Sequence, residues 1–101
     1  MVSLEDVDFS NLVVYLHDNV NAPTSGIDDI KHYCIERDDH CWYDKKIWLY
    51  RIDDYLFKIN HSTIYDNIIV DIFNTLLELK LLISIVDRND TLYRLNEEIT
   101  N

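Results

Sequence analysis

The 101 residues of this chain suit one domain, and a hydrophobic content of 48% excludes an intrinsically disordered chain. Nineteen acidic residues against nine basic ones give a formal net charge of −10. A surface of this sign repels nucleic-acid phosphates and anionic membranes, so neither is an expected partner, whereas basic protein surfaces are attracted. We expect a single domain over residues 1–101.

The N-terminal residues lack the basic, apolar and small-residue pattern of a secretory signal. The longest apolar run, near Leu76–Val86, is interrupted by charged residues and is too short to span a membrane. Two cysteines in such a chain are expected to be reduced, so the sequence predicts a cytoplasmic protein.

The first predicted element is a helix within residues 1–20, capped by Asp8 or Ser10. Its apolar stripe recurs at helical spacing, at Phe9, Leu12, Val13, Leu16 and Val20. A strand over Leu12–Leu16 is the alternative, because two β-branched valines stand there.

A second helix is predicted over Gly26–Arg37, after a loop that holds the only Pro and the only Gly. Ile27, Ile30 and Cys34 recur at helical spacing, and Asp28 and Asp29 occupy the first turn, where carboxylates favour the helix dipole. The polar residues at positions 38–40 are expected to end this helix.

Residues Lys46–Asn60 are predicted to form a β-hairpin that turns at Asp53 and Asp54. Alternation then places six apolar residues on one buried face: Trp48, Tyr50, Ile52, Tyr55, Phe57 and Ile59. We expect that face to pack against the next helix.

That next helix, Ile64–Lys80, is the strongest prediction, because it combines a capping-box variant with a wide apolar stripe. A second hairpin follows, with strands over Leu81–Val86 and Thr91–Leu95 and a turn at residues 88–90. The predicted fold is α+β, with two N-terminal helices and the order α-α-β-β-α-β-β.

Catalytic and metal-binding patterns are weak in this chain. A single glycine excludes a phosphate-binding loop, a dinucleotide-binding loop and a nucleophile elbow. His32, Cys34, His40 and Cys41 lack the paired spacing of a zinc site, and a turn accounts for Asp53 and Asp54 better than a magnesium site does. We expect no enzyme activity, no metal and no cofactor.

The acidic residues concentrate in the first 44 positions, where ten acids face only two bases. Trp42 and Tyr43 stand among them, and such aromatics anchor protein interfaces when polar residues surround them, although Trp42 could instead cover the sheet. The sequence predicts a partner-binding surface comprising Asp28, Asp29, Glu36, Asp38, Asp39, Trp42, Tyr43 and Asp44. The alternative is that the acidic residues only keep the chain soluble.

The leading functional hypothesis is a non-enzymatic inhibitor or antidote that occludes a basic partner. Immunity proteins for nuclease toxins and viral anti-defence proteins use this strategy against nucleic-acid-processing enzymes. The alternative is an adaptor or small subunit of an assembly. It would be winged-helix-like in element order but not DNA-binding, because its long helix exposes acids. A small enzyme that uses the carboxylates and histidines is the third class.

Overall fold

The computed structural model describes residues 4–20, 34–60 and 66–96. These ranges contain η1 (Leu4–Asp6), α1 (Phe9–Asn19), β1 (Cys34–Arg37), β2 (His40–Asp44), α2 (Lys45–Asn60), α3 (Asp66–Glu78), β3 (Leu82–Asp87) and β4 (Asp90–Leu95). The α+β class is confirmed, but the order is α-β-β-α-α-β-β, so the prediction of two N-terminal helices is wrong. No helix within these ranges is both long and apolar enough to cross a membrane.

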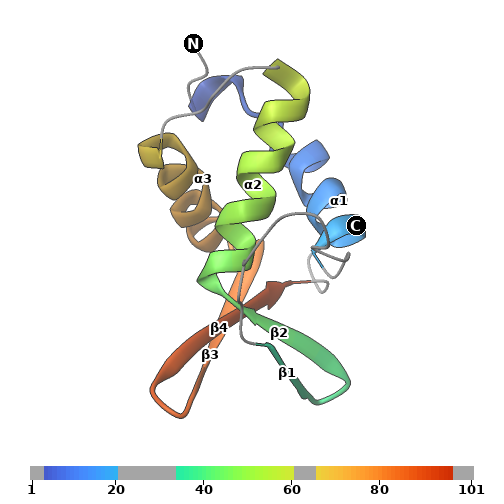
Figure 1. Cartoon of the computed structure of the whole chain (residues 1–101), viewed down its shortest axis with the longest axis vertical. Helices are drawn as coiled ribbons and strands as arrows, with labels where there is room; N and C mark the ends of the chain where they lie inside the picture. The colour runs from blue at the N-terminus through green and yellow to red at the C-terminus, as the bar shows by residue number, and fades with distance from the viewer. Residues whose placement is uncertain (1–3, 21–33, 61–65, 97–101) are drawn as a thin grey trace.

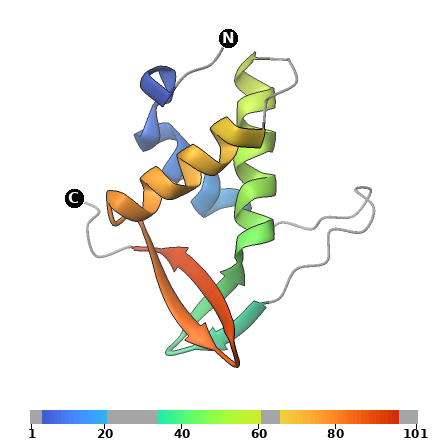
Figure 2. The ribbon, with the colours of Figure 1, turned by 90° about the vertical axis from the view of Figure 1, so that its left-hand side faces the viewer.

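The four strands form one antiparallel sheet in the order β1-β2-β4-β3. It consists of two hairpins joined by β2 and β4, which pair at Tyr43 with Tyr93 and at Asp44 with Leu92. The three helices gather at one end of the molecule and both hairpins project from the other, in two perpendicular views (Figures 1 and 2). The sheet therefore presents two hairpin tips far from the helices.

Helix α1 is confirmed, and its start is fixed by a side chain. Asp8 has an extended backbone, and its Oδ1 accepts hydrogen bonds from the backbone N–H groups of Ser10 and Asn11 at 3.1 and 3.2 Å. These bonds satisfy two donors that a helix N-terminus leaves without partners. Leu12 and Leu16 are the buried residues of this helix.

The predicted helix Gly26–Arg37 is wrong over its last four residues, and residues 26–33 lie outside the described ranges. Cys34–Arg37 form strand β1, which pairs with β2 from Cys34 opposite Tyr43 to Arg37 opposite His40. Residues 38 and 39, expected to end a helix, instead form the hairpin turn. Pairing with Trp42 and Tyr43, which are strong strand formers, overrides the weak local helix signal.

The predicted hairpin Lys46–Asn60 is also wrong, because these residues belong to helix α2. The buried side chains follow helical spacing rather than alternation: Ile47, Trp48, Arg51, Ile52, Tyr55 and Leu56. Phe57, placed in the core by the hairpin interpretation, is 53% exposed, and Tyr50 is only half-buried. The side chain of Ile59 lies outside the described part.

Helix α3 and the second hairpin are confirmed. Helix α3 ends in a Schellman motif: Lys80 has φ 61°, its N–H donates to the Leu77 carbonyl, and the Leu81 N–H donates to the Leu76 carbonyl. The β3–β4 turn consists of Arg88 and Asn89, which both have positive φ, as a two-residue hairpin turn requires.

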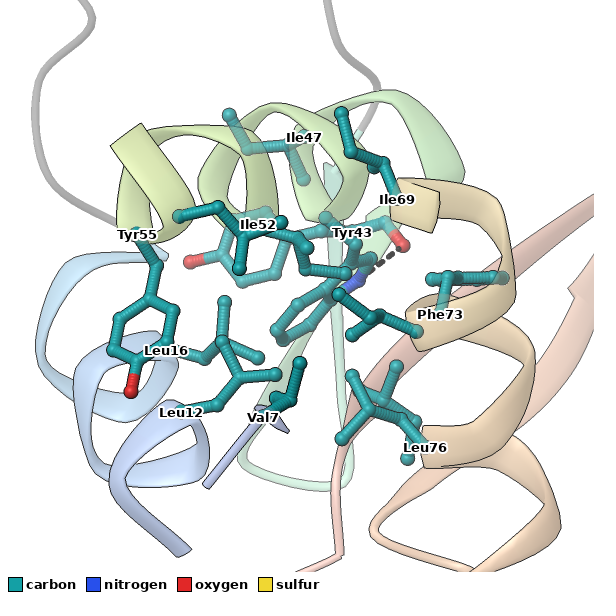
Figure 3. Packing of buried hydrophobic residues seen from close by; sticks show 14 residues of the cluster. Val7, Leu12, Leu16, Tyr43, Ile47, Ile52, Tyr55, Ile69, Phe73 and Leu76 are labelled. Atoms are coloured by element: carbon teal, nitrogen blue, oxygen red, sulfur yellow. Dashed lines mark hydrogen bonds between the residues drawn. The ribbon is translucent and has the colours of Figure 1, made fainter. Parts of the chain in front are cut away.

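One hydrophobic cluster lies between the helices and the sheet, and Figure 3 shows its packing. Trp48 is 1% exposed at its centre, and its indole Nε1 donates to the carbonyls of Tyr43 and Tyr93, both at 3.2 Å. Because these two residues form one of the two pairs that join β2 to β4, one side chain attaches α2 to both hairpins.

Candidate functional site

The tip of the β1–β2 hairpin carries two adjacent exposed carboxylates, Asp38 and Asp39. Both residues have left-handed backbones, with φ of 56° and 64°. Two-residue hairpin turns of this kind favour Asn-Gly or Gly-Gly, and a left-handed conformation costs about 1 kcal/mol for most residues other than glycine and less for Asn or Asp. Two acids at this turn are therefore not the most stable choice for the fold.

Three other acidic side chains in the described part have structural roles. Asp8 caps α1, Asp54 accepts a hydrogen bond from the Tyr15 hydroxyl and lies 3.9 Å from the Lys58 amine, and Asp87 pairs with Arg37. No described residue forms an ion pair with Asp38 or Asp39. Their charges are thus available to an external group.

Glu36 lies close behind the tip, exposed on β1 and opposite Cys41. Together, Glu36, Asp38 and Asp39 place three carboxylates within four residues at the projecting end of one hairpin. We call these three residues the acidic tip.

The other predicted site residues do not join the acidic tip. Asp44 lies at the far end of β2, roughly 16 Å from Asp39 along the strand, and its Oδ1 accepts the Ile47 N–H at 3.3 Å, which caps α2. Trp42 and Tyr43 are buried, at 6% and 8% exposure. Asp28 and Asp29 lie outside the described residues.

Trp42 and Tyr43 support the hairpin from opposite faces of the sheet. Tyr43 belongs to the main core, whereas the Trp42 ring lies under the Arg94 guanidinium at 5.0 Å, and its Nε1 donates to the Arg37 carbonyl at 3.4 Å. Little of either ring is accessible, so their partner-binding role stays a prediction, and their packing favours a supporting role.

An ion pair connects the two hairpins near their tips. The Arg37 Nη2 lies 3.0 Å from Asp87 Oδ1, although β1 and β3 are the outermost strands of the sheet. The side chains of Arg37 and Asp87 lie on the same face of the sheet, opposite the main core. The contact restrains the β1–β2 hairpin against its neighbour and so helps to position the acidic tip.

The two thiols share the core-side face of the β1–β2 hairpin at diagonal positions, and both are exposed. Partial desolvation by the surrounding residues, together with the nearby Cys41, Asp44 and Glu36, raises the pKa of the Cys34 thiol. A thiol held in its protonated form is a poor nucleophile. Across the described ranges, no three His, Cys, Asp or Glu side chains gather as metal ligands; His32 lies outside them.

A hollow of about 250 Å³ lies beside this hairpin, where β2 and β4 separate. His17, His40 and Arg94 converge on it from α1, β2 and β4. Sequence reasoning missed this combination because positions 17, 40 and 94 become neighbours only through the tertiary fold.

No family model, curated protein sequence or solved structure matches this chain. Functional assignment therefore depends on the residues and geometry described above.

Proposed function

We propose that this chain is a non-enzymatic protein-binding domain that inhibits a basic partner by placing its acidic tip in the partner's positively charged cleft. The observation that carries the proposal is the exposed Asp38–Asp39 pair at the end of a projecting hairpin. A nuclease toxin or another nucleic-acid-processing enzyme has such a cleft, since it must bind phosphates.

The mechanism is occlusion assisted by electrostatic steering. A net charge of −10 attracts a basic protein over a distance, and the acidic tip then occupies the positions of substrate phosphates. A hairpin suits this role because its backbone is already ordered, so binding requires little additional loss of conformational entropy.

Three observations favour this proposal over the alternatives. An adaptor needs a contiguous apolar surface, but in the described part of the chain the large exposed apolar side chains come from four different segments: Val14, Phe57, Leu79 and Val86. An enzyme that uses the cysteines needs an activated thiol, and the raised pKa of Cys34 disfavours one. Exposed Asp71 and Glu78 on α3 likewise disfavour DNA binding by a winged-helix arrangement.

Affinity capture from the native host, with the intact chain as bait, tests the proposal. We expect a basic, nucleic-acid-processing protein that is captured by the native chain and retained poorly by an Asp38→Asn/Asp39→Asn variant. Asn tolerates left-handed backbones as well as Asp does, so this variant removes two charges and keeps the turn.

The matched control is Asp71→Asn/Glu78→Gln, which removes two exposed charges from α3. Retention of the partner by the control but not by the tip variant supports the proposal. A partner with an acidic surface, or equal retention of the native chain and the tip variant, would contradict it.

A further inference from the structure

The hollow beside the β1–β2 hairpin has the composition of a small-ligand pocket. Strands β2 and β4 pair only at Tyr43–Tyr93 and Asp44–Leu92, and beyond those pairs they diverge towards His40 and Leu95 (Figure 1). The C-terminal end of α1 closes the resulting space with His17 and the C-cap residue Val20, together with Trp48.

Arg94 is the main polar group of this pocket, and its hydrogen-bonding capacity is only partly used. Its Nη1 donates to the Leu95 carbonyl at 3.0 Å, and its guanidinium stacks on Trp42. Its Nε is buried and has no hydrogen-bond partner. Buried donors without partners are rare and require an explanation.

The charge of Arg94 is equally without a counterion in the described residues. No carboxylate in the described part of the chain forms an ion pair with Arg94. Arginine stays charged and presents five N–H donors, which match a carboxylate or phosphate group. The buried Nε offers a ligand no accessible surface, but an exogenous anion that contacts the rest of the guanidinium from the pocket would supply a counterion.

The other residues that line the pocket indicate the charge and polarity of the ligand that it could bind. The His40 imidazole adds an N–H donor in any protonation state, whereas Val20, Trp48 and Leu95 form apolar walls. Asp39 also lines the pocket, and its negative charge favours a singly charged carboxylate over a phosphate dianion.

We propose that this pocket binds a small organic monocarboxylate, with its carboxylate held by Arg94 and His40 and its apolar part against Val20, Trp48 and Leu95. The pocket and the acidic tip share Asp39. The two proposals are still tested separately, because ligand binding is read at Arg94 and Trp48 and partner binding is read with the tip variant.

The test uses phenylacetate as the probe and 2-phenylethanol as its uncharged counterpart. Titration of the native chain, followed by NMR of the Arg94 Nε–H and Trp48 indole N–H signals, should show saturable shifts with a dissociation constant of roughly 1–10 mM. The Arg88 Nε–H signal, at the distant β3–β4 turn, should not move. 2-Phenylethanol should bind about tenfold more weakly or not at all.

Two matched variants complete the test. Arg94→Gln should raise the dissociation constant about tenfold or more, whereas Arg88→Gln, which removes the same charge, should change it less than about twofold. The native-chain titration stands even if Arg94→Gln fails to fold. No saturable shift at Arg94, equal binding of the alcohol, or equal effects of the two variants would overturn the proposal.

Discussion

Trp48 is the residue on which the relative placement of the helices and the two hairpins depends most. Its indole N–H is shared between two carbonyls at 3.2 Å, one from each inner strand, inside a site with 1% exposure. Buried carbonyl groups that lose their donor destabilise the folded state by about 1–3 kcal/mol.

Replacing Trp48 with Phe should therefore lower the free energy of unfolding by about 2–4 kcal/mol, through the lost hydrogen bonds and the cavity that remains. Trp42→Phe is the control, because the Trp42 N–H makes a single, longer contact of 3.4 Å; we expect less than about 2 kcal/mol. Urea denaturation of both variants measures the difference, and equal losses would count against this role of Trp48.

Tyr43 makes the stability depend on pH in the alkaline range. Burial, together with the nearby Cys41 and Cys34, raises the pKa of Tyr43 from 10.0 to about 12. Because the folded state favours the protonated phenol, this contribution is fully present below pH 10 and is lost as the pH rises towards 12.

The difference in unfolding free energy between the native chain and Tyr43→Phe should thus be constant below pH 10 and shift against the native chain from there to about pH 12. Other alkaline groups titrate in both proteins and cancel in this comparison. Chemical denaturation across that range is the measurement. A difference that does not vary with pH would refute the assignment.

At the scale of elements, the helical structure of residues 45–60 and the hairpin interpretation predict different losses of stability on mutation. Both interpretations bury Ile52, but only the hairpin buries Phe57, which the helix leaves 53% exposed. Ile52→Ala should cost about 2–5 kcal/mol and Phe57→Ala less than about 1 kcal/mol. Thermal or urea unfolding distinguishes them, and comparable losses would restore the hairpin interpretation.

Local signals were sufficient for the elements whose ends are fixed by their own residues. Asp8 caps α1, and Arg88 with Asn89 turns the second hairpin, so both features could be read from the sequence. Segment 45–60 was ambiguous because its apolar residues satisfy both a period of two and a helical period. Ile47 and Leu56, which strand alternation would place on the opposite face of that hairpin, are fully buried, and this decides for the helix.

Substitutions in the β1–β2 turn that remove its two negative charges should increase the stability of the fold. Replacing Asp38 with Asn and Asp39 with Gly supplies the residues that this turn type favours, so the unfolding free energy should rise by about 0.5–1 kcal/mol. The same variant should bind the partner more weakly. A stability that falls would show that the acids serve the fold rather than binding.

At the scale of the whole molecule, the acidic N-terminal stretch does not form one surface. Glu5 and Asp6 lie in η1, at the opposite end of the molecule from the hairpin tips (Figure 1). Charge imbalance alone identified Asp38 and Asp39, but it could not separate them from Asp44, which caps a helix, or from Trp42, which is buried. Those roles depend on pairing between β2 and β4, which sequence spacing does not reveal.

The central claim is that the acidic tip guides and completes binding to a basic protein. The most direct measurement is the association rate constant with the captured partner at two ionic strengths, for the native chain, Asp38→Asn/Asp39→Asn and the control Asp71→Asn/Glu78→Gln. We predict that the tip variant associates about threefold to tenfold more slowly at low salt and depends less on salt, with the control close to the native chain. Equal association rates for all three proteins, or a rate independent of salt, would contradict the claim.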